Sequence, residues 1–123
     1  MLFRESETVE LKEVVVDDIK KEIIAFANCD GGKLYIGVRD DGTVIGLDNA
    51  DSVSLQISNM VRDAIKPDIT MFLHYETIVE NGKNVVVVDI QRGTDRPYYL
   101  AKKGMRPEGV YCLLYTSDAA DDL

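Results

Sequence analysis

Three carboxylates in the first third of the sequence could hold a divalent metal ion. Glu5 and Glu10 lie five residues apart, and Asp40 follows a predicted strand just before an Asp-Gly turn. Mg²⁺ and Mn²⁺ prefer oxygen ligands of this kind. Such an ion can activate water and stabilise the charge that develops on a phosphodiester. Glu5, Glu10 and Asp40 are therefore the candidate metal ligands and catalytic residues.

Glu5 and Glu10 can approach each other only if the chain bends between them. A spacing of five places two side chains on opposite faces of one continuous strand. A bend near Ser6, with Glu5 in a loop and Glu10 in the strand, would bring them together. The alternative is that all three acids are solvated, as carboxylates near strand ends and turns usually are.

A second group of residues suits nucleic acid, although the net charge of −8 opposes binding to a polyanion. Between Gln91 and Arg106, five basic residues accompany a single acid, Asp95, and two tyrosines could stack on bases. The alternative is a solvated loop with one packed tyrosine. The candidate contacts are Arg96, Tyr98, Tyr99, Lys102, Lys103 and Arg106.

Other catalytic patterns are missing from the sequence. Gly31-Gly32 follows a predicted helix and precedes a strand, which is the reverse of the order in a phosphate loop, so a structural turn is expected there. No Cys–His spacing resembles a zinc site, and no serine motif resembles a nucleophile elbow. His74 lies in a strand pattern without a partner and is interpreted as structural.

The elements that must position these residues alternate between short strands and helices. Apolar spacing predicts a helix over 17–28, which Asp17 can cap, and another from about Ser52 to a limit at Pro67. Strands are expected over 8–16, 34–38, 43–47, 70–79 and 83–92, with hairpin turns at 41–42 and 81–82. Four successive valines, 85–88, indicate a central strand covered on both faces. The predicted fold class is α+β, a mainly antiparallel sheet with two helices packed against it.

The chain has the properties of a small cytoplasmic domain. Its 123 residues suit one domain, no apolar run is long enough to span a membrane, and no secretory signal is visible. Cys29 and Cys112 imply no disulfide framework, so free thiols in a reducing compartment are expected. Residues 113–123 continue none of these patterns and resemble translated adapter or vector sequence, so we expect the native domain to span residues 1–112.

Two motifs in order resemble the Schlafen AlbA-like domain, a family also catalogued as a DNA-binding or divergent AAA domain. The first is Glu5-Ser-x-x-x-Glu10-Leu-Lys. The second runs from Ala25-Phe-Ala-Asn28 through Gly31-Gly32 to Asp40-x-Gly42-x-x-x-Gly46. Arg96-Pro-Tyr-Tyr99 and Gly109-Val-Tyr111 are similar to the last strand region of the family. The sequence departs from the family after Tyr111, where an arginine and a Gly-Ser-rich turn are usual.

The resemblance implies an α+β fold and a role in nucleic-acid metabolism. The first hypothesis is a domain that binds DNA or RNA, as a fragment of a protein similar to transcriptional regulators or helicases. The second is a metal-dependent endoribonuclease on structured RNA, because Glu5, Glu10 and Asp40 match the positions of the three acids with which some family members cleave RNA. The third is an interaction module that forms a homodimer, since larger relatives pair two such lobes.

Overall fold

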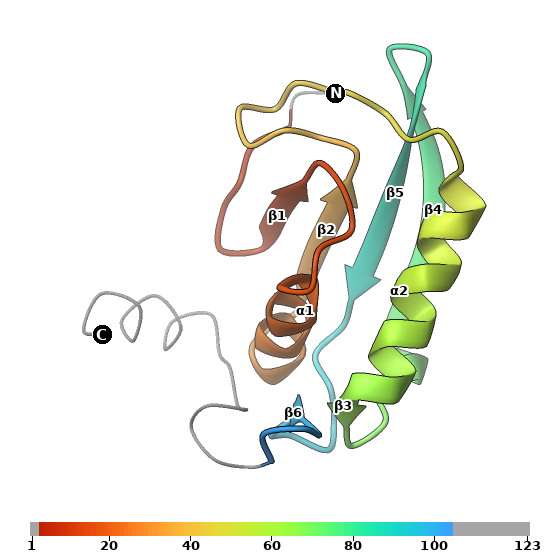
Figure 1. Cartoon of the computed structure of the whole chain (residues 1–123). Helices are drawn as coiled ribbons and strands as arrows, with labels where there is room; N and C mark the ends of the chain where they lie inside the picture. Colours follow the sequence, from red (N-terminus) through yellow and green to blue (C-terminus); the bar gives the residue numbers. More distant parts are fainter. Residues whose placement is uncertain (1–2, 105–123) are drawn as a thin grey trace.

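The computed structural model describes residues 3–104 and has a four-stranded sheet at its centre, in the order β1-β2-β5-β4 (Figure 1). β1 is parallel to β2, whereas β5 is antiparallel to both β2 and β4. The predicted α+β class with a mainly antiparallel sheet is confirmed. The strands are β1 (Val9–Lys12), β2 (Gly32–Ile36), β4 (Leu73–Glu80) and β5 (Lys83–Ile90).

A small second sheet closes one end of the domain. It pairs β3 (Ile65–Lys66) with β6 (Tyr99–Leu100), and β6 lies against α1. A short 3-10 helix, η1 (Thr70–Phe72), leads from β3 into β4. This end of the molecule therefore joins the C-terminal part of the described chain to the helices.

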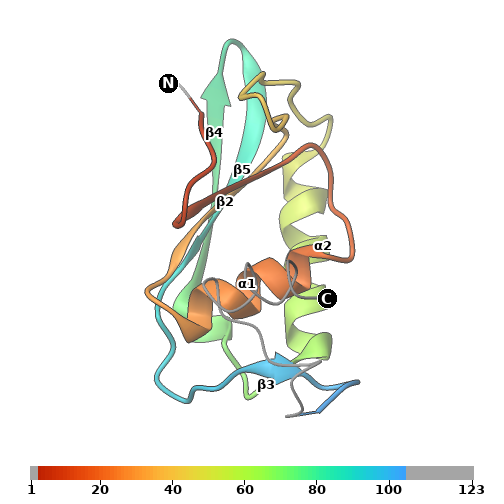
Figure 2. The ribbon, with the colours of Figure 1, turned by 90° about the vertical axis from the view of Figure 1, so that its left-hand side faces the viewer.

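Two helices pack on the same face of the sheet, as Figure 2 shows. α1 (Ile19–Asn28) has the predicted end, but the expected cap is wrong, because Asp17 binds Lys20 and no side chain caps the first turn. α2 (Ala50–Ala64) begins two residues earlier than predicted. It does so because the Asn49 side chain accepts a hydrogen bond from the Ser52 N–H at 3.0 Å.

The hairpin turn and the central position of β5 agree with the prediction, but β4 begins at Leu73 because residues 70–72 form η1, and β5 ends at Ile90 rather than at residue 92. Asn81 and Gly82 both have positive φ, at 54° and 74°, as the tight turn between two twisted strands requires. The four valines of β5 are all buried, because β5 is flanked by β2 and β4 and both of its faces are covered there. β5 is thus the central strand of the core.

The first strand is shorter than predicted, and the second has the predicted length but lies two residues earlier in the sequence. β1 ends at Lys12 rather than at residue 16. β2 ends at Ile36, because Gly37 takes a φ of +106° and turns the chain. The expected return strand over 43–47 is reduced to a single bridge between Val38 and Val44.

The sheet separates two apolar clusters. Leu34, Ile36, Val86 and Val88 face the helices in the larger cluster. On the opposite face, the smaller cluster is closed by Phe3, whose ring meets that of Tyr35 edge-on at 4.9 Å between centroids. The second face has no helix over it among the described elements.

Several predictions concern the ends of the chain. Cys112, Arg106 and residues 113–123 lie outside the described residues. The expectation of a free thiol is wrong for Cys29, which is disulfide-bonded. The number and spacing of cysteines in the sequence could not predict this bond, because the fold decides which parts of the chain meet. Across residues 3–104, no helix combines the length and apolar character needed to traverse a bilayer.

Candidate functional site

Glu5 and Glu10 are brought together by the bend that their spacing requires. A bridge between Ser6 and Val9 reverses the chain just before β1, and the Ser6 hydroxyl accepts a hydrogen bond from the Thr8 N–H. The Glu5 carboxylate then accepts a hydrogen bond from the Leu11 N–H at 3.2 Å. This places it beside Glu10, and the two carboxyl groups share a hydrogen bond.

Two residues that the sequence did not single out complete this group. Glu10 pairs with Leu34 across the β1–β2 ladder, so its side chain points to the helix face of the sheet. There the Lys12 ammonium lies 3.1 Å from Glu22 of α1 and 3.7 Å from Glu10. We call Glu5, Glu10, Glu22 and Lys12 the carboxylate cluster.

The carboxylate cluster changes the acidity of its members. Burial, followed by the charges of Glu22 and Glu5, raises the pKa of Glu10 to about 7. The hydrogen bond from Glu5 adds to this rise, and Lys12 opposes it. Burial also tends to lower the pKa of Lys12, but the neighbouring carboxylates reverse this, so its pKa is raised. Glu10 thus holds its proton up to near neutral pH, beside the ammonium group of Lys12.

Asp40 does not join Glu5 and Glu10, so the predicted three-carboxylate site is not formed. The turn that carries Asp40 packs through Val38 and Val44 into the cluster on the opposite face of the sheet from Glu10. Asp40 itself is exposed, and it is not among the charges that act on Glu10. Within residues 3–104, no three His, Cys, Asp or Glu side chains are arranged to hold a metal ion.

The basic segment, residues 91–104, is fixed to the end of α1 by one side chain. The Asn28 amide donates a hydrogen bond to the Tyr98 carbonyl at 3.0 Å and accepts one from the Tyr98 N–H at 2.7 Å. A third bond joins the Gly93 N–H to the Ala27 carbonyl at 3.0 Å. Asn28 thus pairs with the segment as a neighbouring strand would.

Tyr98 belongs to the core and not to the binding surface that the sequence predicted. Its side chain is fully buried, and its hydroxyl accepts a hydrogen bond from the Asp95 N–H. The ring fills the space beside Gly93, where any Cβ would overlap it. Tyr99, on β6, is half-buried and keeps part of its surface available. The outcome matches the alternative of one packed tyrosine.

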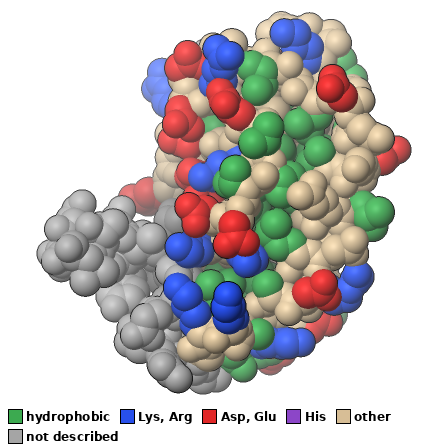
Figure 3. Space-filling model, in the orientation of Figure 1, with side chains coloured by type: hydrophobic (Ala, Val, Ile, Leu, Met, Phe, Trp, Pro, Cys, Tyr) green, Lys and Arg blue, Asp and Glu red, His purple; other side chains and the backbone are tan. Residues whose placement is uncertain are grey.

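The basic side chains of this segment remain exposed. Lys102 and Lys103 extend from the turn after β6, while Arg92 is paired with Asp30 and Arg96 donates to the Gly93 carbonyl. Figure 3 shows Lys and Arg side chains gathered over the corner where α1 meets β6. The guanidinium groups are thus held in place, whereas Lys102 and Lys103 extend freely into solvent.

Two lysines of α1 extend this basic surface. The bond from Lys20 lowers the pKa of Asp17 most, and the charges of Lys21 and Lys102 lower it further. Lys102 therefore lies close to Lys20 and Lys21, although they are some eighty residues apart in the sequence. Only the fold could show this, because both lysines look like ordinary solvated positions on an amphipathic helix.

The fold and the site define a small α+β domain in which α1 contributes Glu22 to the carboxylate cluster and holds the basic segment through Asn28. The chain belongs to the family described as Schlafen, AlbA_2, whose model matches residues 5–112. This confirms the resemblance carried by the two sequence motifs. A comparison with curated protein sequences found no match.

Two solved structures share the fold. One is the N-terminal domain of a RecG-related protein from Nitrosomonas europaea, named after an ATP-dependent DNA helicase. It is 26% identical, with a TM-score of 0.71 over 89% of this chain and 80% of that domain. The DIP2311 protein from Corynebacterium diphtheriae is 17% identical, with a TM-score of 0.59. The match covers 81% of this chain but only 20% of the DIP2311 chain.

The raised pKa of Glu10 predicts an unusual dependence of stability on pH. Glu10 holds its proton up to about pH 7 in the folded state, against 4.5 for an ordinary glutamate. Its contribution to stability is therefore full below pH 4.5 and is lost as pH rises through 7. Glu10→Gln should gain about 1 kcal/mol over the parent at pH 8, a figure reduced for partial exposure, and almost nothing at pH 5. Urea unfolding at both pH values measures this.

The exposed Glu7 provides the control, because Glu7→Gln should change stability equally at both pH values. An equal effect of Glu10→Gln at pH 5 and pH 8 would contradict the raised pKa of Glu10.

The Asn28 side chain is predicted to hold the basic segment in place. Asn28→Ala leaves the Tyr98 N–H and carbonyl without their partners and should cost about 1–3 kcal/mol. Asn28→Asp keeps only the accepting oxygen, so its free energy of unfolding should fall between those of the parent protein and of Asn28→Ala. Urea unfolding gives the energies, and hydrogen exchange at the Tyr98 amide reports the local bond. Gln56→Ala, on the exposed face of α2, should change little. Unchanged exchange in Asn28→Ala would refute the assignment.

Proposed function

We propose that this domain binds nucleic acid through the basic segment and the adjacent lysines of α1. The observation that carries the proposal is that Asn28 fixes an exposed, locally cationic segment on an otherwise acidic chain. Within residues 91–104, four basic side chains accompany one acid. The similar solved structure from Nitrosomonas europaea supports a general role in nucleic-acid metabolism, because the name of that protein relates it to a DNA helicase.

Lys102 and Lys103 are the proposed phosphate contacts, with Arg96 beside them. Both lysines are exposed, and neither shares an ion pair with another described residue, so binding would break no ion pair within residues 3–104. Lys20 and Lys21 each pair with an aspartate, so they would contribute less. Tyr99 is the proposed stacking residue, since Tyr98 is enclosed in the core.

The acidic remainder of the chain limits how this surface can bind. A net charge of −8 repels a polyanion at long range, and the repulsion weakens over about 10 Å at 0.1 M salt. Binding must therefore depend on a few close contacts at one corner of the domain. We infer that the domain contacts a short stretch of nucleic acid, either on a single strand or along one groove of a duplex.

Replacing the two exposed lysines tests the proposal. Lys102→Ala/Lys103→Ala should weaken binding and reduce the slope of log K against log salt by up to about 1.8 for duplex DNA or 1.4 for a single strand. Fluorescence anisotropy with labelled oligonucleotides at several salt concentrations measures both quantities.

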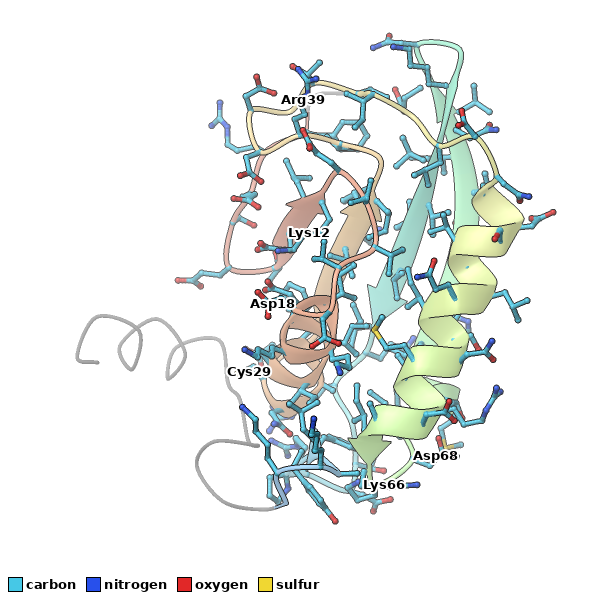
Figure 4. The ribbon with its side chains drawn as sticks, viewed as in Figure 1. Lys12, Asp18, Cys29, Arg39, Lys66 and Asp68 are labelled. Carbon is cyan, nitrogen blue, oxygen red and sulfur yellow. The ribbon has the colours of Figure 1, made fainter. Side chains whose placement is uncertain are left out.

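The matched control removes two cations at the opposite end of the sheet. Arg39 lies there in Figure 4, and Lys83 begins β5 at the adjoining hairpin turn. Arg39→Ala/Lys83→Ala changes the net charge equally but should leave the slope unchanged. Equal effects of the two double variants would mean that only total charge matters and would overturn the assignment.

The endoribonuclease alternative stays a prediction from the resemblance, and the residues in place do not fit it. Glu5 and Glu10 converge, but the turn that carries the third acid packs into the cluster on the other face of the sheet. We therefore expect transfer RNA to remain intact with Mn²⁺ on a denaturing gel. Cleavage by the parent protein that is absent from Glu10→Gln would contradict this expectation.

A further inference from the structure

The outer edge of β4 is an unprotected strand edge. β4 is the last strand of the four-stranded sheet and pairs only with β5 among the described elements. It runs for eight residues in unbroken register, without a bulge, a proline or a lysine. Natural edge strands usually carry one of these features, because an open row of backbone groups attracts another strand.

The backbone groups available for pairing alternate along β4. The Gln91 N–H donates to the Phe72 carbonyl, so the backbone groups of Phe72 face β5. In an antiparallel ladder, the next residue and every second one after it then face outward. These are Leu73, Tyr75, Thr77 and Val79, whose N–H and carbonyl groups lie along the free edge.

The sequence of β4 is complementary to itself in one antiparallel register. With Thr77 opposite Thr77 of a second copy, His74 faces Glu80 and Glu76 faces Ile78, over seven paired residues. Centring the pair on Glu76 would oppose two Glu76 carboxylates, and centring it on Ile78 would oppose Glu76 and Glu80. The register centred on Tyr75 avoids such clashes but pairs only five residues of β4.

Exposed apolar side chains accompany this edge. Val79 on β4 is 66% exposed, and Met71, in the turn that leads into β4, is 76% exposed. In the Thr77-centred register, Val79 would lie opposite Tyr75 of the second copy. A partner strand would therefore cover apolar surface as well as backbone groups.

We infer that β4 is a homodimer interface, in which two copies of this chain join their sheets through a two-fold axis at Thr77. We take the partner to be a second copy because, in this register, no side chain of β4 lies opposite a side chain of the same charge on the other copy. A two-fold contact of this kind closes, so it yields dimers rather than fibres. It uses none of the side chains of the basic segment, although that segment begins beside the start of β4, where the Gln91 N–H donates to the Phe72 carbonyl.

Sedimentation velocity of the whole chain from 1 to 500 µM, roughly the range for a small interface, tests this inference. The parent protein should show twice the monomer mass at the upper end. Dimerisation should strengthen at higher salt, because each copy carries a net charge of −8. Val79→Arg should weaken it at least about tenfold. Val14→Arg, a matched change of another exposed valine, should leave it unaltered.

Thr77→Pro removes the central pair of outward N–H donors while leaving the β4–β5 ladder intact, because proline is tolerated at a free edge. It should give a folded monomer by circular dichroism. A monomeric parent protein over the whole range, larger open assemblies, or an unchanged dimer in Val79→Arg and Thr77→Pro would each overturn the inference.

The register can be tested by oxidation of engineered cysteines. Thr77 residues opposite each other would have Cα atoms about 5.5 Å apart, within reach of a disulfide. The two His74 residues would lie about 20 Å apart along the strands. Thr77→Cys should therefore cross-link on a non-reducing gel, and His74→Cys should not. The reverse result would refute the Thr77-centred register.

Discussion

The arrangement of the candidate site depends on the pair of hydrogen bonds between the Asn28 amide and the backbone of Tyr98. These bonds join the last turn of α1 to a segment seventy residues further along the chain. An amide is suited to this position because it can donate and accept at once, as a peptide group does. With the segment anchored, Tyr98 enters the core and the charged residues on either side of it remain at the surface.

The same helix organises the acidic side of the site. Glu22 projects from α1 toward β1, where Lys12 lies between it and Glu10. The ammonium group thus lies between two carboxylates and neutralises part of their charge. Glu5 is hydrogen-bonded to Glu10, and its charge helps to raise the pKa of Glu10. α1 therefore separates a partly neutralised acidic cluster from a basic surface.

The one-sided covering of the sheet has a further consequence. Because both helices lie on one face, Phe3 and the turn around Val38 and Val44 are the parts of residues 3–104 that close the other face. That turn carries Asp40 away from the helix face, which explains why the acids of the family pattern do not all converge. The edge of the sheet at β4 is likewise left open, since no described element crosses beside it.

Much of the fold could be predicted from local sequence, because each pattern there encodes one physical preference. The Asn81-Gly82 turn, the four valines of β5 and the apolar stripe of α1 each determined an element by themselves. The Glu5–Glu10 spacing also required the bend at Ser6 that the structure contains. The residue at which β2 ends could not be predicted in this way, because Gly37 suits both a strand and a turn.

Only the tertiary structure decided which side chains meet. It placed Glu22 and Lys12 with Glu10, packed the turn that carries Asp40 into the cluster on the other face of the sheet, and assigned Tyr98 to the core and Tyr99 to the surface. It also brought Lys102 near Asp17, the partner of Lys20. The physical reason is that spacing along a chain fixes the face on which a residue lies, whereas the packing of whole elements fixes what lies opposite that face.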